Sequence, residues 1–335
     1  MINKIYEKTK NFIKENYKFM LFLIFLTILF NFKLPYFITT NGGLLNIEDK
    51  ITINTKKETK GSFNLAYVNE LQATLPTLLI AKLNKDWQII KKQEMIMNNE
   101  EIKDIYIRDA LSLQEANTNA IFLAYQKAHK KVTIKQNKMY VIYIDQQAKT
   151  NLKIGDQIIK INNQAIINKE ELLNKIKQLN NHEKIKLEVK NENNITTKTA
   201  ICFKKNDNIL LGIMLANVKD IETSPNISIK FKDSESGSSG GLMMSLAIYN
   251  KLIKQDITGG RKIVGTGTID EVGNVGSIGG VAYKLKGAVL AKADIFLVPA
   301  GKNYREAINL KNKNDYEIKI IPVKTFDEAI KVLKQ

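Results

Sequence analysis

The 335-residue chain is 44% hydrophobic and 25% charged, a globular composition that excludes a mostly disordered chain and a collagen-like repeat. Its single cysteine, Cys202, excludes an intramolecular disulfide and a multi-cysteine metal site, and the only histidines, His129 and His182, argue against a zinc or haem centre, so we predict no metal and no cofactor. The net charge of +17 is compatible with nucleic-acid binding, but only three of the 51 basic residues are arginine and lysine is spread along the whole chain, so we predict no nucleic-acid partner.

The N-terminal segment predicts a membrane anchor. Residues 1–18 form a basic tail with five lysines, and Phe19–Phe30 is uncharged and almost wholly apolar. With a snorkelling Lys33, the apolar stretch extends over 19–38 and approaches the roughly 20 residues that a bilayer needs. A cleaved signal peptide is the alternative, but no small-residue cleavage site follows. We therefore predict a single-pass transmembrane helix over 19–38, with the N-terminus cytoplasmic and the rest of the chain extracytoplasmic.

The next segment, from about residue 45 to residue 125, mixes strands and a helix. Strand-like runs cover Ile51–Ile53 and Gly61–Val68. Alanine and leucine recur at helical spacing over Ser112–Lys127, which predicts a helix there.

Residues 130–203 are richer in short β-strands. Strands are expected over Met139–Ile144 and Lys184–Lys190, with a helix near Asn168–Leu179 between them. The turn Leu152-Lys153-Ile154-Gly155-Asp156 leads into an apolar strand. This pattern resembles PDZ domains, which bind extended peptides by strand addition. On this resemblance the peptide-binding loop corresponds to Gln136–Tyr140.

A serine-rich turn then joins a strand to a helix. The strand is expected over Asn226–Phe231, and the helix after the turn carries apolar residues in register from Leu242 to Tyr249. Such a turn places serine hydroxyls and free backbone N–H groups at a helix N-terminus, where they can stabilise an oxyanion. By itself the pattern is more typical of an N-cap than of a catalytic site.

A second stretch, Val264–Ala288, changes that interpretation. It contains Thr266-Gly267 and, after the pair Gly279-Gly280, a lysine four residues on. Together the two stretches resemble the catalytic domain of Lon-type proteases, whose serine precedes its lysine by about 45 residues. The register places the serine on Ser239 and the lysine on Lys284. With the anchor and the PDZ-like segment, the whole chain resembles the single-pass, PDZ-containing Lon-like serine proteases of bacteria.

The resemblance implies a Ser239–Lys284 dyad. A serine hydroxyl needs a base near neutral pH, and a desolvated, neutral lysine amine can provide it. Helical spacing places Lys284 on the apolar flank of its helix and Lys286 on the solvated side. Supporting roles fall on Thr266, which would hydrogen-bond the amine, and on the backbone N–H groups of Gly237, Ser238 and Gly240, which would hold the oxyanion.

The sequence departs from the family pattern beside the serine. The family's proline and alanine are replaced by Ser238 and Gly240, which leaves Ser236 and Ser238 as neighbouring candidates for the nucleophile. We interpret Asp233 and Glu235 as solvated loop charges. Since no Gly-x-x-x-x-Gly-Lys-Ser/Thr string occurs, the activity is expected to be independent of ATP.

The predicted fold class is α+β, with a Lon-type catalytic domain over 205–335, a PDZ domain over 130–203 and residues 45–125 completing the catalytic domain, so that the PDZ domain is inserted in it. The predicted function is a membrane-anchored serine endopeptidase that cleaves polypeptides and forms a homo-oligomer. Two alternatives are a catalytically inactive extracytoplasmic PDZ scaffold and a basic surface protein that binds envelope polyanions.

Overall fold

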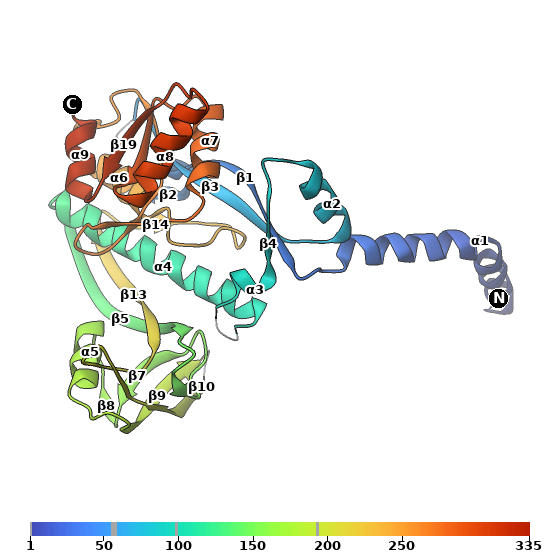
Figure 1. Cartoon of the computed structure of the whole chain (residues 1–335), viewed down its shortest axis with the longest axis horizontal. Helices are drawn as coiled ribbons and strands as arrows, with labels where there is room; N and C mark the ends of the chain where they lie inside the picture. Colours follow the sequence, from blue (N-terminus) through green and yellow to red (C-terminus); the bar gives the residue numbers. More distant parts are fainter. Residues whose placement is uncertain (1, 55–58, 98–99, 192–193) are drawn as a thin grey trace. The chain divides into compact units, whose positions relative to one another are not determined.

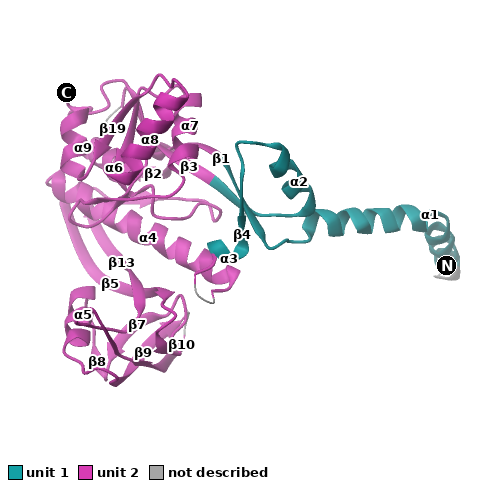
Figure 2. Ribbon diagram, in the orientation of Figure 1, with its two compact units in different colours: residues 1–41, 69–95 teal, residues 42–68, 96–335 magenta. Residues whose placement is uncertain are grey.

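The computed structural model describes residues 2–54, 59–97, 100–191 and 194–335. The chain divides into two compact units (Figure 2), residues 1–41 with 69–95 and residues 42–68 with 96–335. The two long strands β1 (Tyr36–Asn46) and β3 (Ser62–Gln72) contribute residues to both units.

The smaller unit is built on one end of β1. Its other elements are α1 (Ile2–Asn31), α2 (Leu75–Leu83), β4 (Gln88–Lys91) and α3 (Lys92–Met95). Strand β4 pairs antiparallel with the start of β1, and Ile38 is buried together with Ala73 and Ala81. Helix α2 begins after Thr74, whose backbone N–H donates to the hydroxyl of Thr77.

Helix α1 does not extend over the predicted transmembrane span of 19–38. It ends at Asn31, and Tyr36 already begins β1. The apolar run inside the helix, Phe19–Phe30, is about 18 Å long at 1.5 Å per residue, whereas the hydrocarbon core of a bilayer is about 30 Å thick. Within the described residues, no helix has both the length and the apolar character needed to cross a bilayer. The predicted transmembrane helix over 19–38 is therefore wrong.

The larger unit contains a sheet with helices on both faces (Figure 1). The strand order of the whole sheet is β19-β18-β15-β3-β1-β4, and β3, β15, β18 and β19 run parallel to one another. The elements of this part are η1 (Ile47–Lys50), β2 (Ile51–Ile53), α4 (Ile102–Lys127), β14 (Ile227–Ile229), α6 (Gly241–Leu252), β15 (Lys262–Gly265), β16 (Thr268–Ile269), β17 (Val275–Gly276), α7 (Val281–Leu290), β18 (Ile295–Pro299), α8 (Lys302–Lys313), β19 (Lys319–Val323) and α9 (Phe326–Leu333).

Successive side chains of a strand point to opposite faces of the sheet, so alternate residues of β15 and β18 belong to two different hydrophobic cores. Ile263 and Leu297 pack with α6, α9 and the end of α4, whereas Val264 and Phe296 pack with α7 and α8. Every residue of β18 is buried, as expected of a parallel strand that is covered on both faces. Strand β3 comes from before residues 130–203 and β15 from after them, yet they are neighbours in this one sheet.

Residues 130–224 form a second sheet with a core of its own. The strand order is β13-β5-β7-β9-β10-β6, and Leu172 and Ile176 of a short helix cover one side of it. Its elements are β5 (Lys131–Ile144), β6 (Lys149–Thr150), β7 (Gln157–Ile161), β8 (Gln164–Ala165), α5 (Lys169–Lys177), β9 (Lys184–Asn191), β10 (Asn194–Ile201), β11 (Phe203–Lys205), β12 (Asn208–Leu210) and β13 (Ile213–Ser224). Strands β5 and β13 remain paired from Ile144↔Ile213 to Lys131↔Ser224, and α4 packs against both (Figure 1).

The predicted peptide-binding loop at Gln136–Tyr140 is wrong. These residues lie in the middle of β5, where Gln136 pairs with Asp220 of β13 and Tyr140 pairs with both Ala216 and Gln157. One edge strand of the sheet is β13, and the other is the two-residue β6. Strand β13 is preceded by Gly212, whose φ of +70° is the left-handed region that favours glycine. The loop that precedes this edge strand is therefore Leu211–Gly212.

Candidate active site

Ser239 lies in the turn immediately before α6. Gly240 caps the helix and Gly241 begins it, with the Gly241 N–H donating to the carbonyl of Ser238 at 3.2 Å. A Cβ on Gly241 would lie 2.8 Å from Cγ2 of Ile269 and 3.0 Å from its backbone nitrogen, so the helix start can approach β16 only as glycine. The small residues of this turn thus let the N-terminus of a wholly packed helix approach the neighbouring strand.

The structure brings Lys284 and Thr266 to Ser239. Nζ of Lys284 lies 3.0 Å from Oγ of Ser239 and 3.2 Å from Oγ1 of Thr266. The Thr266 hydroxyl in turn donates to the backbone carbonyl of Ser239 at 3.2 Å, and the Gly267 N–H donates to the same carbonyl at 2.8 Å. Thr266 and Gly267, the two residues that follow β15 in the parallel part of the sheet, therefore hold the turn that carries Ser239.

Lys284 is buried on α7. Its exposed fraction is 4%, and Thr266 is completely buried. The helix begins after Gly280, which has φ +68° and caps it, and this fixes the position of the fourth residue beyond it. Lys286, two residues along the same helix, is half-buried. Of the two lysines of α7, only Lys284 contacts the serine.

The predicted oxyanion donors divide into two groups. The N–H of Gly237 donates to the backbone carbonyl of Asp109 at 3.0 Å, so the prediction that it is free to bind an oxyanion is wrong. The backbone N–H groups of Ser238, Ser239 and Gly240 have no hydrogen-bond acceptor among the residues that the structure describes. These three groups lie at the start of α6, where the helix dipole favours negative charge.

Glu235 anchors the loop that leads to Ser239. Its carboxylate oxygens lie 2.7 and 2.8 Å from Nζ of Lys50, and one of them accepts the N–H of Lys232 at 2.7 Å. The side chains of Lys50 and Glu235 are 12% and 23% exposed. The interpretation of Glu235 as a solvated loop charge is therefore wrong, whereas Asp233 is exposed, as expected of a loop residue.

This ion pair predicts a loss of stability in acid. Burial alone would raise the pKa of Glu235, but the hydrogen bonds from Lys50 and from the Lys232 N–H outweigh it and hold the pKa below the usual value of 4.5. A lowered pKa in the folded state stabilises the protein above the unfolded pKa, and that stabilisation is lost as the pH falls through the folded pKa. We expect Glu235→Gln to lower the free energy of unfolding by about 1 kcal/mol at pH 7 and by less at pH 3.

Thermal unfolding at both pH values would measure the effect of Glu235→Gln. The control is Glu306→Gln, which removes an exposed glutamate of α8. If Glu235→Gln lowers the stability by the same amount at pH 3 and at pH 7, the charged form of Glu235 is not what stabilises the fold.

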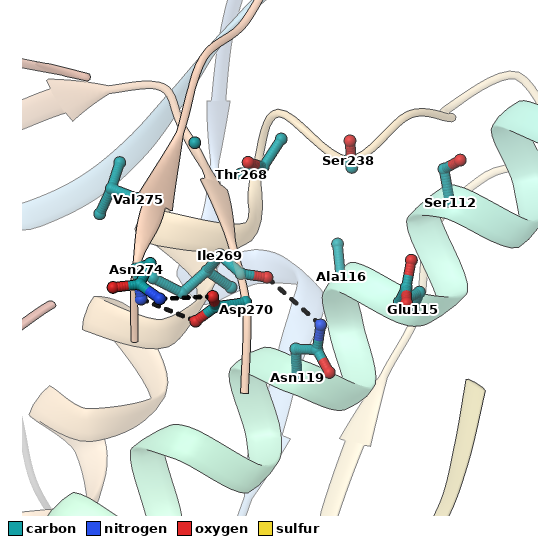
Figure 3. A pocket seen from close by; sticks show the side chains of 11 residues that line it. Ser112, Glu115, Ala116, Asn119, Ser238, Thr268, Ile269, Asp270, Asn274 and Val275 are labelled. Carbon is teal, nitrogen blue, oxygen red and sulfur yellow. Dashed lines mark hydrogen bonds between the residues drawn. The ribbon is translucent and has the colours of Figure 1, made fainter. Parts of the chain in front are cut away.

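A cavity of about 360 Å³ lies beside the serine turn (Figure 3). Ser238, the neighbour of Ser239, lines it from one side. One wall comes from α4, with Ser112, Glu115 and Asn119, and the opposite wall comes from β16, β17 and the loop between them. Within the described residues, no three histidine, cysteine, aspartate or glutamate side chains gather as metal ligands.

The residues of α4 in this wall were not predicted as site residues. Positions 112, 115, 116 and 119 are spaced to share one face of a helix, so a stripe of serine, glutamate and asparagine was the available signal. The predicted helix over Ser112–Lys127 contains them, but nothing local indicates that this face lies opposite β16. Their place at the cavity follows from contacts between residues more than 100 positions apart.

Comparison with known proteins supports the assignment of the C-terminal part. Residues 226–335 match the family of the Lon protease (S16) C-terminal proteolytic domain. The chain is also similar to the crystal structure of the PDZ domain of the SdrC-like protein from Listeria monocytogenes, with 21% sequence identity, a TM-score of 0.22, and coverage of 25% of this chain and 92% of that one. Comparison with curated proteins gave no significant match.

Proposed function

We propose that the protein is a serine endopeptidase in which Ser239 is the nucleophile and Lys284 the general base. The observation that carries the proposal is the 3.0 Å contact between Oγ of Ser239 and Nζ of a lysine that is 4% exposed. This distance lies within the range for a nucleophile and its base. The match of residues 226–335 to a peptidase domain supports the same chemistry.

The mechanism follows from the positions of these groups. Burial disfavours the charged form of an amine, and a neutral Lys284 amine can accept the proton of Ser239 as Oγ attacks the carbonyl carbon of the scissile peptide. The negative oxygen of the tetrahedral intermediate would be held by the free N–H groups at the start of α6. Lys284 then gives the proton to the leaving amine, and water hydrolyses the acyl-enzyme in a second round of the same proton transfers.

Thr266 would support the base. Its hydroxyl accepts a hydrogen bond from Nζ of Lys284 and donates to the carbonyl of Ser239. The two contacts orient the amine relative to the turn that carries the nucleophile. Thr266 therefore acts by positioning, and it need not exchange a proton with the substrate.

We propose polypeptides as the substrates and the sheet of residues 130–224 as a module that positions them. Strand β13 is at the edge of that sheet, and a strand edge offers backbone groups to an extended peptide. The open part of this edge would be Ile213–Ala216, because farther along the strand the N–H of Asn217 donates to Glu115. Assembly into a homo-oligomer and an extracytoplasmic location of the catalytic domain stay predictions from the sequence.

The second candidate is an inactive scaffold, which the replacement of the family's proline by Ser238 would favour. Removing an amine from water is costly, and a scaffold would gain nothing from a lysine buried against a serine hydroxyl. The Ser239–Lys284 contact therefore favours the enzyme.

The test is cleavage of an unfolded protein by the purified full chain without ATP. We expect mass spectrometry to find new peptide termini, formed at the same rate with and without ATP or EDTA, and we expect a peptide boronate, which adds to a serine hydroxyl, to inhibit their formation. If no cleavage occurs, or if EDTA but not the boronate stops it, the proposal is overturned.

A further inference from the structure

The mechanism above does not use Lys219, a second buried lysine. It lies on β13 and is 4% exposed. Its Nζ is 2.6 Å from Oδ1 of Asn119 on α4 and 3.0 Å from Oε2 of Glu271, in the loop between β16 and β17. Burying an ammonium group is costly unless it is paired, so an apolar residue would fill this position more cheaply if packing were its only role.

Lys219 determines which way the amide of Asn119 faces. An ammonium group only donates hydrogen bonds, so the amide oxygen must face it. The amide nitrogen then faces the other way and donates to the backbone carbonyl of Ile269 at 3.3 Å, a contact drawn in Figure 3. With the amide reversed, its oxygen would face the Ile269 carbonyl and lone pairs would oppose each other.

The carbonyl that Asn119 holds belongs to a wall of the cavity beside the serine turn. Ile269 and Asn119 both line that cavity together with Ser238. Ile269 also ends a short run that begins at Thr266, and the carbonyl of Gly267 within that run accepts the N–H of Leu242 on α6. The orientation of the Asn119 amide therefore affects the position of Ile269 and of β16, which form the wall opposite α4.

We propose that the cavity beside the serine turn receives the substrate, and that Lys219 is a positioning residue which fixes the β16 wall of this cavity through the amide of Asn119. Strand β13 also forms the edge of the sheet of residues 130–224, so the same strand would carry the peptide-binding edge and set the cavity wall. This inference rests on the proposed peptidase function, and it concerns substrate binding and not the proton transfers at Ser239.

The test compares Lys219→Met and Asn119→Asp with wild type in the full chain. Asn119→Asp keeps the volume and can still pair with Lys219, but it places an oxygen against the Ile269 carbonyl. We expect both variants to raise KM for a peptide substrate about tenfold, the effect of one lost hydrogen bond, and to leave kcat within about threefold. Hydrolysis of a small activated ester, which requires Ser239 and Lys284 but does not fill the cavity, should be unchanged in Lys219→Met.

The matched control is Lys138→Met. It removes a lysine of β5 that forms an ion pair with Asp220 of β13, and it leaves Asn119 and its contacts unchanged. We expect wild-type KM for this variant. A wild-type KM for Asn119→Asp would overturn the inference, as would an equal loss of peptide and ester hydrolysis in Lys219→Met, which indicates general disruption. If wild type hydrolyses neither substrate, the proposed function fails instead.

Discussion

Replacing Ser239 by alanine is expected to lower the rate of peptide cleavage by on the order of 10³-fold or more, because the atom that attacks the carbonyl is lost. The substitution removes one oxygen from a half-buried turn whose backbone is held by the Gly267 N–H and the Thr266 hydroxyl, and both of these bond the Ser239 carbonyl and not its side chain. The fold should therefore survive. The measurement is the initial rate of cleavage, normalised to protein whose thermal unfolding midpoint equals that of wild type.

The matched control is Ser238→Ala, which removes the same group one residue earlier. The Ser238 side chain lines the cavity and lies apart from the dyad contacts. We expect its cleavage rate to stay within about tenfold of wild type, since the cost of one polar contact to the substrate is about 1 kcal/mol. Full activity in Ser239→Ala together with loss in Ser238→Ala would move the nucleophile by one residue.

The juxtaposition of Ser239 and Lys284 could be predicted from the resemblance to Lon-type proteases, because the motifs that carry this resemblance are local. Each residue sits at a fixed offset from glycines that shape its own turn or helix start, Gly241 for one and Gly280 for the other. The two offsets and the spacing of 45 residues are visible in the sequence. In the folded chain the two helices pack on opposite faces of one sheet, and Nζ of Lys284 lies 3.0 Å from Oγ of Ser239.

The contacts of Lys219 could not be predicted in the same way. Its partner Asn119 is 100 positions away, and Asn119 in turn reaches Ile269 across 150 positions. In the sequence nothing distinguishes Lys219 from the many other lysines of the chain, and its contacts with Asn119 and Glu271 form only when α4 and the loop after β16 pack near β13. A pattern of residue types carries no information on such a pairing.

The two wrong predictions about secondary structure, the transmembrane helix and the peptide-binding loop, have a related cause. Counting apolar residues over 19–38 adds together two segments with different backbones, a helix that ends at Asn31 and a strand that begins at Tyr36. The β-strand pattern over Met139–Ile144 was correct, but it does not indicate which strand lies at the sheet edge. That depends on sheet order, and here the chain returns through Gly212 to place β13 outside β5.

Replacing Lys284 tests the base separately from the nucleophile. Lys284→Met keeps a flexible chain of similar length in the buried position and removes the amine, so we expect cleavage to fall by on the order of 10³-fold with the serine intact. Lys284→Arg gives the sharper comparison, because a guanidinium can still donate to Ser239 and Thr266 but cannot be deprotonated in a protein. Both variants should therefore be equally inactive if the amine accepts the serine proton.

If the amine only positions the serine by donating a hydrogen bond, Lys284→Arg should retain much of the activity that Lys284→Met loses. Lys286→Met is the control for a lysine on the same helix, and we expect it to cleave at a rate close to that of wild type. Cleavage kinetics of the three variants on one peptide, with thermal unfolding to confirm that each is folded, decide between the two roles. Because a guanidinium can still donate hydrogen bonds but cannot accept a proton, retained activity in Lys284→Arg would contradict the role of Lys284 as the base.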